Sequence, residues 1–264
     1  MVNTLNSGTD FLYNFATPIQ GFEAVSTSTW SPTLQSTITA VTTPPIGGTD
    51  VLSLRGVTQA LPVTPPFMPN TSAALHITPS SSVAQFDIVI VSDCEGSAVL
   101  QISNADPATS GTIAHNTGVG VPGNATKNLG KIFRDDAQIL LPQVKTFYIA
   151  EGASGRPALW ELVNSEPLGT NNPRELVEGV EDMQILYGED TDSDETVDVY
   201  VTADNVSDWD NVVATRVSLL LQTLEDRVAM QAQRYAYNGT TVTPDDRRLR
   251  RVFTTTVGIR NRIP

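Results

Sequence analysis

The chain is poor in cysteine, which limits the covalent chemistry open to it. Its 264 residues include one cysteine, Cys94, in the segment IVSDCEGSAV. A single cysteine cannot build a disulfide framework within the chain. Cys94 is thus a small buried residue, a reactive thiol, or half of a disulfide whose partner lies outside these residues. It has no basic neighbour to lower its thiol pKa, which favours the disulfide if the protein is exported.

Long hydrophobic runs are also missing. No apolar stretch approaches the roughly 18–20 residues that a helix needs to span a bilayer. The first ten residues, MVNTLNSGTD, lack the basic segment and apolar core of a signal peptide. We therefore expect the chain as it stands to be soluble.

Basic residues are scarce and unevenly placed. Sixteen Lys and Arg oppose 29 Asp and Glu, for a formal net charge of −13. Such a chain repels a phosphate backbone, which disfavours nucleic-acid binding. Between Glu175 and Asp210 there are 13 acidic residues and no Lys or Arg, while six basic residues lie between Arg247 and Arg262. These charges can pair within the fold or face different partners, and pairing is the simpler expectation.

The first half of the chain is rich in Thr, Ser, Pro and Gly and shows little helical periodicity. Four prolines within 59–73 predict a surface loop there, and the polar segment 105–131 predicts a long excursion. Short β-branched and aliphatic runs bounded by turn residues predict strands, with a turn at Cys94–Gly96 joining the last two. The predicted strands are 49–57, 84–94 and 97–104.

The second half predicts further strands and one helix. The sequence Gly-Ala-Ser-Gly joins strand-like segments at 143–150 and 157–163, which is typical of a hairpin. Apolar residues near helical spacing predict a short helix over 174–182, which continues into a strand with the sequence MQILYG. In TVDVYVTAD, valines alternate with Asp, Tyr and Thr, which is typical of a half-buried strand. Residues 214–226 favour a strand, with a helix as the alternative, and RRVFTTTVGIRNR closes the chain as a strand.

These elements together predict a mainly β (α+β) fold. It consists of antiparallel sheets and one short helix, and residues 1–264 form a single globular domain. No internal repeat divides the sequence.

Two short motifs resemble catalytic or cofactor signatures, but each lacks its required context. A GxGxxG spacing begins at Gly118, yet a proline and a polar, Asn-rich continuation follow it instead of an amphipathic helix. Ser154 lies in a motif close to a nucleophile elbow, but within a hairpin turn, and only His76 and His115 could serve it as a base. Catalysis by a pair of carboxylates remains an alternative, although no feature of the sequence marks such a pair. We therefore predict no catalytic and no cofactor-binding residue.

The strongest chemical signal is the segment EDTDSDETVDVY at 189–200. If Asp190 is position 1 of a Ca²⁺ loop, then Asp192, Asp194, Thr196 (through its carbonyl) and Asp198 hold positions 3, 5, 7 and 9. Carboxylates this close repel one another without a cation. The sequence predicts a Ca²⁺ site with a structural role, and a flexible acidic turn is the alternative.

This loop departs from the usual Ca²⁺ loop in two ways. Glu195 stands where glycine normally permits a sharp turn, and Val201 stands where a bidentate glutamate normally completes the shell. Glu195 must then adopt the backbone conformation that glycine would supply. The segments on both sides of the loop are predicted to be strands and not the helices of an EF-hand. The ligand that Val201 cannot supply must then come from another residue, such as Glu189 or Asp204.

Long segments of the chain resemble one known family. LVEGVEDMQILYGEDTDSDETVDVYVTADNVSDWDNVVATRVSLLL and DRRLRRVFTTTVGIRNR are similar to the type IV pilus minor pilin PilW. VLSLRG, DIVIVSDCEGSAVLQIS and TFYIAEGASGRPALWEL fit the same family in the same order. The resemblance covers most of the chain from about residue 49 onward. A more distant likeness is to the type II secretion minor pseudopilin GspJ.

The resemblance implies a pilin-like periplasmic domain that follows a hydrophobic N-terminal helix. That helix anchors the protein in the inner membrane and later polymerises into the extracellular fibre. This sequence does not contain it, so we expect the chain to begin after the helix. The partner of Cys94 is then expected just after the helix, and the chain alone is expected to be a monomer.

The resemblance also implies a structural function without enzymatic activity. Members prime the assembly of type IV pili, which serve twitching motility and cell adhesion. They sit at the fibre tip with other minor pilins and a tip adhesin, above the major pilin.

Two other function classes compete with this one. The chain could be a secreted, Ca²⁺-stabilised β domain that acts as an adhesin or a carbohydrate-binding module, or an exported hydrolase with unmarked carboxylates. Trp209, between two aspartates, is either an interface anchor or a partly buried core residue.

Overall fold

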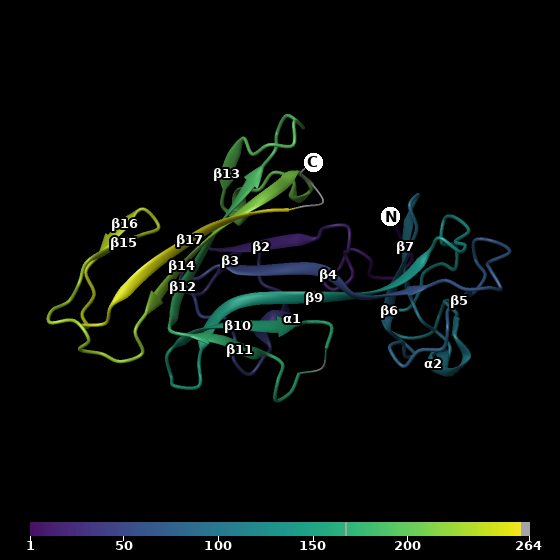
Figure 1. Ribbon diagram of the computed structural model, residues 1–264, viewed down its shortest axis with the longest axis horizontal. Coiled ribbons are helices and arrows are strands. Elements are labelled where there is room, and N and C mark those ends of the chain that lie inside the picture. Colours follow the sequence, from purple (N-terminus) through teal and green to yellow (C-terminus); the bar gives the residue numbers. More distant parts are fainter. Residues whose placement is uncertain (167, 260–264) are drawn as a thin grey trace. The chain divides into compact units, whose positions relative to one another are not determined.

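The computed structural model describes residues 1–166 and 168–259 of a mainly β chain, as the sequence predicts (Figure 1). Its described helices are short: α1 (Ser36–Thr39), α2 (Pro107–Ser110) and the 3-10 turns η1 (Ala203–Asn205) and η2 (Trp209–Asn211). None of the described helices has the length and apolar character to cross a membrane. The final residues of the predicted closing strand, 260–262, lie outside the described part.

The chain divides into two compact units. Unit 1 contains residues 1–16 and 55–143, and unit 2 contains residues 17–54 and the described residues from 144 onward. Two long strands, β4 (Val51–Pro62) and β9 (Gln138–Glu151), contribute residues to both units.

Unit 1 is built on antiparallel strands around a dense apolar core. β6 (Ile88–Ser92) pairs with β7 (Ser97–Gln101) and with the start of β9, as the predicted hairpin requires. β1 (Val2–Asn3) adds to β7 in parallel, and β5 (Leu75–His76) pairs with β8 (Thr112–Ile113). The core includes Leu75, Val89, Leu100, Ile113, Phe133 and Ile139. The polar excursion at 105–131 is therefore partly structured, since α2 and β8 lie within it.

Unit 2 contains a first group of strands around β4 and β9. β2 (Ile19–Ala24) pairs with β3 (Trp30–Ser31) and with β4, all antiparallel. The end of β9 pairs with β10 (Pro157–Val163), which confirms the predicted hairpin, and β10 pairs with β11 (Arg174–Glu178).

A second, four-stranded antiparallel sheet completes unit 2. Its order is β13 (Val199–Val201), β12 (Val180–Glu189), β14 (Val212–Gln222) and β17 (Arg250–Gly258). A separate hairpin is formed by β15 (Tyr235–Tyr237) and β16 (Thr240–Val242). Tyr187, Ile185, Met183, Val212 and Ile149 are among the buried residues of this unit's core.

The predicted helix over 174–182 is wrong. The segment forms β11 and the start of β12, separated by Gly179 at φ +80°. Met183, Ile185 and Tyr187 are buried at alternate positions, which is strand periodicity, and Gly179 accepts the N–H of Gln222 and donates to Pro157. Pairing with β10 and β14 therefore overrides a local spacing that suits a helix. For 214–226, the strand interpretation is confirmed over Val212–Gln222.

The predicted proline-rich loop starts later than expected. β4 runs on to Pro62 before the chain leaves the strand, so the first part of 59–73 is extended and paired. The remaining prolines follow the strand, where a missing backbone N–H costs nothing.

Candidate functional site

The acidic segment connects β12 to β13 as a structured loop. Asp190 is 8% exposed and organises it. Its Oδ1 accepts the backbone N–H groups of Ser193 (2.7 Å) and Asp194 (3.2 Å), and its Oδ2 accepts that of Glu195 (2.8 Å). The carboxylate thus satisfies three donors of a tight turn, a pattern common for aspartate in loops.

The backbone of this loop is strained where the sequence lacks glycine. Ser193 has φ +65° and Glu195 has φ +68°, both in the left-handed region. The expectation that Glu195 adopts a glycine-like conformation is confirmed. The hydrogen bonds to Asp190 hold both residues in this conformation.

Three of the five predicted metal ligands gather in space. Asp190, Asp192 and Asp194 each offer one carboxylate oxygen, and these oxygens all lie within 4.8 Å of one another. Repulsion from Asp194 and Asp198 raises the pKa of Asp192 above its ordinary value. The negative charge is therefore concentrated where a cation would be stabilised.

The other two predicted ligands, Thr196 and Asp198, form hydrogen bonds within the loop. Asp194 Oδ1 accepts the N–H (2.9 Å) and the hydroxyl (2.6 Å) of Thr196. Asp198 Oδ2 accepts the N–H and hydroxyl of Thr191 at 2.8 and 2.7 Å, which lowers the pKa of Asp198. Hard oxygen donors of this kind suit Ca²⁺, but three carboxylates provide only part of its six to eight ligands.

The two residues suggested as extra ligands have other partners. Glu189 is 3% exposed, and its Oε1 accepts the N–H and hydroxyl of Ser207 and the N–H of Asp208. Asp204 accepts the hydroxyl of Thr202 at 2.6 Å. Glu189 therefore ties the end of β12 to the segment before η2.

Trp209 belongs in part to the core. Its ring packs edge-on against Tyr187, with ring centroids 4.8 Å apart and planes inclined by 78°. Of the two interpretations of Trp209, the partly buried core residue agrees with the structure.

A second group of carboxylates lies inside unit 2. Asp50 is 2% exposed, and it accepts the N–H of Ala24 at 3.0 Å and that of Ile185 at 2.7 Å. Burial raises the pKa of Asp50 to about 6. Burial, with the nearby charges of Asp50 and Asp204, raises the pKa of Glu23 to about 7. Both carboxylates are thus poised to take up protons near neutral pH.

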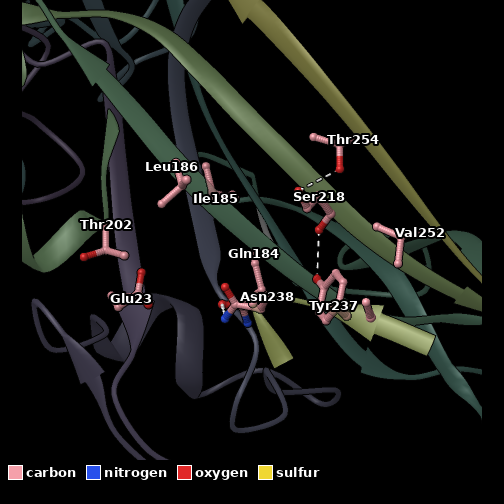
Figure 2. A pocket seen from close by; sticks show the side chains of 12 residues that line it. Glu23, Gln184, Ile185, Leu186, Thr202, Ser218, Tyr237, Asn238, Val252 and Thr254 are labelled. Atoms are coloured by element: carbon pink, nitrogen blue, oxygen red, sulfur yellow. Dashed lines mark hydrogen bonds between the residues drawn. The ribbon is translucent and has the colours of Figure 1, made fainter. Parts of the chain in front are cut away.

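Glu23 also lines a cavity of about 290 Å³ (Figure 2). On its walls, Tyr237 donates its hydroxyl to the carbonyl of Ser218 at 2.9 Å, and Asn238 donates to Gln184 at 3.1 Å. The hydroxyls of Ser218 and Thr254 lie 3.0 Å apart. Glu23 and Tyr237 are the titratable side chains among the described residues that line this cavity. The arrangement suits a small polar ligand or water, and it offers no nucleophile with a base beside it.

Sequence reasoning missed Glu23 and Asp50. Neither lies in a motif, because their environment is made by strands far apart in the chain: Asp50 precedes β4 but binds β2 and β12. The only local signal is the placement of Asp50 just before a run of apolar residues.

Two of the basic residues near the end of the chain, Arg248 and Arg250, have partners within the fold. Arg250 binds Glu181 and Asp246, at 2.6 Å each. Arg248 donates to the carbonyls of Thr223 and Leu224. The expected pairing of opposite charges within the fold is thus confirmed for Arg250.

The structure also places Ser154, the two histidines and Cys94. Ser154 lies in the β9–β10 turn of unit 2, whereas His76 and His115 lie in unit 1. His115 is buried, its Nε2 is 3.0 Å from the carbonyl oxygen of Lys127, and burial lowers its pKa. Cys94 is exposed, with a free thiol.

Comparison with known proteins finds one family match, which lies within the second unit. Residues 146–261 match the family model of type IV pilus-assembly protein W, PilW. This part of the chain is PilW-like. The match includes the acidic loop, β10 to β17 and most of the cavity lining. No curated protein and no solved structure matches the chain, and the likeness to GspJ is not confirmed.

Proposed function

We propose that this chain is a structural subunit of the type IV pilus machinery, a minor pilin that takes part in priming pilus assembly. The observation that carries the proposal is the PilW match over 146–261, which suggests a role in type IV pilus assembly. As a minor pilin it would face the periplasm from the inner membrane and then enter the fibre, with other minor pilins, the major pilin and a tip adhesin as partners.

The site geometry supports a structural function. The buried carboxylates of Asp50 and Glu189 each accept backbone N–H groups from other segments, so they serve to hold strands and loops together. In the cavity lining, Tyr237 binds Ser218, Asn238 binds Gln184, and the hydroxyls of Ser218 and Thr254 lie within hydrogen-bond distance. Side chains used in this way stabilise a subunit.

We further propose that the acidic loop binds Ca²⁺. Asp190, Asp192 and Asp194 would supply carboxylate oxygens, with Thr196 through its carbonyl, Asp198 and water completing the shell. Ca²⁺ would relieve the repulsion that raises the pKa of Asp192. Its role would be to stiffen the β12–β13 hairpin.

Co-purification tests the pilus proposal. Pili sheared from cells that carry a tagged copy of the chain are expected to contain it at a low ratio to the major subunit. A tagged copy of an unrelated periplasmic protein is the control. Complete absence of the chain from pili and from complexes with pilus subunits would contradict the proposal.

One observation favours a second candidate, a carbohydrate-binding or adhesin domain. The cavity of about 290 Å³ presents amide and hydroxyl groups from Gln184, Asn238 and Thr254, the kinds of group that bind sugar hydroxyls. Glycan binding that Asn238→Ala abolishes would favour this function. Binding that is absent from a broad glycan panel would remove it.

A further inference from the structure

β17 is the outermost strand of the four-stranded sheet (Figure 1), and among the described residues no strand pairs with its other side. Thr223 donates its N–H to Leu249, and Ile259 donates to Val213. Odd-numbered residues of this strand therefore direct their main-chain groups at β14, because hydrogen-bonding direction alternates along a strand. The even-numbered residues Val252, Thr254, Thr256 and Gly258 direct theirs outward, and these groups have no hydrogen-bond partner among the described residues.

This edge lacks the features that usually protect a free strand. From Phe253 to Gly258 every residue is exposed, and the segment Val252–Gly258 has no charge and no proline. Its pairing with β14 runs without a bulge over nine residues. Free edges are normally short, charged, bulged or covered, since an open one is a template for another strand. An unprotected edge of this length is therefore suited to binding.

The side chains beside the edge combine apolar and basic groups. Phe253 and Val257 are 50% and 53% exposed on one face of β17. Arg251, on the same face, is exposed and lies over the ring of Phe253, with its guanidinium carbon 5.3 Å from the ring centroid. Unlike Arg250, it has no carboxylate partner among the described residues.

From these features we propose that the open edge of β17 accepts an extended segment of another protein chain as a fifth strand. The segment would carry β-branched or aromatic side chains beside Phe253 and Val257 and a carboxylate beside Arg251. Main-chain hydrogen bonds to the even-numbered residues would supply affinity, and the side chains would supply specificity. The inference rests on the proposed function in taking the partner to be another pilus subunit, but its test needs no pilus.

A second copy of this chain fits the edge less well. In an antiparallel pairing centred on Thr254, Arg251 of one copy lies opposite Val257 of the other. The guanidinium then gains no carboxylate, and no opposite-charge pair stabilises the contact. Charge complementarity thus favours an acidic strand over self-pairing.

A synthetic peptide provides a probe of the required chemistry. The fluorescent peptide DETVDVYVTAD copies residues 194–204, which carry valines at alternate positions 197, 199 and 201 together with three aspartates and one glutamate. We expect it to bind the whole chain with an affinity that falls as salt rises. Replacing its aspartates and glutamate with asparagine and glutamine should weaken binding several-fold and remove most of the salt dependence.

Two matched variants test whether the main chain of the edge is the site. Thr256→Pro removes an outward N–H and leaves the pairing with β14 intact, whereas Thr256→Ala keeps that N–H. We expect Thr256→Pro to weaken peptide binding about tenfold or more and Thr256→Ala to change it less than about twofold. Circular dichroism and thermal melting establish that both variants are folded.

A charge exchange tests the role of Arg251. Arg251→Glu should weaken binding of the acidic peptide, and a peptide with lysines at the acidic positions should bind this variant more tightly than it binds the wild type.

Several results would overturn the proposal: no binding of the peptide at millimolar concentration, equal binding by Thr256→Pro and wild type, or no effect of charge. Sedimentation of the protein alone measures whether it forms a dimer. A dimer that Thr256→Pro abolishes would mean that a second copy fills the edge, which contradicts an acidic partner strand. Failure of these binding tests leaves the pilus assignment standing, whereas absence of the chain from pili leaves the binding result unaffected.

Discussion

The carboxylate of Asp50 accepts the backbone N–H of Ile185 at 2.7 Å, across 135 positions of the sequence. Its other oxygen accepts the N–H of Ala24. One buried side chain thus joins β2, the start of β4 and β12, and it connects the PilW-like residues to a segment that lies outside the family match. We regard it as a principal structural support of unit 2.

Removal of this carboxylate should destabilise the protein. Asp50→Ala leaves two buried N–H groups without acceptors, at a cost of about 1–3 kcal/mol for each. Asp50→Asn keeps one acceptor and should have an intermediate effect. Urea unfolding measures both, with Glu225→Ala, an exposed position, as control. Equal unfolding midpoints for Asp50→Ala and the control would contradict the role given to Asp50.

The buried acids also make stability depend on pH. The folded-state pKa values of Glu23 (about 7) and Asp50 (about 6) lie above their ordinary values, so the folded state binds protons more tightly than the unfolded state. Their stabilising contribution is complete below pH about 4 and is lost as the pH rises to about 7.

Glu23→Gln isolates this effect. The melting temperature of the wild type should fall relative to that of Glu23→Gln between pH 5 and pH 8, because the variant has no proton to lose. Thermal melts at several pH values provide the measurement. Parallel curves for the two proteins would show that Glu23 titrates as it does in the unfolded chain.

Calcium should raise the melting temperature through the acidic loop. The double variant Asp192→Ala, Asp194→Ala should lose the rise, because it removes two of the three gathered carboxylates and keeps Asp190, which holds the turn. Asp204→Ala, outside the group, is the matched control. Calorimetry that detects no heat of binding at millimolar Ca²⁺ would rule the site out.

The strained residue of the same loop gives an independent prediction. Glycine adopts φ +68° without the cost that Glu195 bears, so Glu195→Gly should stabilise the protein by up to about 1 kcal/mol. Glu195→Val should destabilise it, since β-branched residues resist this conformation. Chemical unfolding distinguishes the two, and a loss of stability in the glycine variant would speak against backbone strain at this position.

The sequence was sufficient for features set by local chemistry. The hairpin of β9 and β10 follows from its Gly-Ser turn, and the acidic loop between β12 and β13 follows from its aspartate spacing. The helix predicted over 174–182 failed because Leu176 and Val177, placed on a helix face by their spacing, lie exposed on β11, while β12 buries alternate residues against the core.

The site of Glu23 and Asp50 could not be predicted for a related reason. A carboxylate becomes buried and proton-binding only when distant strands surround it, and no residue near Asp50 in sequence marks Ile185 as its partner. The cavity beside Glu23 depends in the same way on β12, β14, β15 and β17.

The most direct test of the account is the number of surface pili on cells that lack this chain. Electron microscopy of a deletion strain is expected to show far fewer type IV pili than the parent, with recovery when the intact chain, including any native N-terminal segment, is supplied in trans. An unchanged number of pili in the deletion strain, with normal twitching, would contradict a role in pilus assembly.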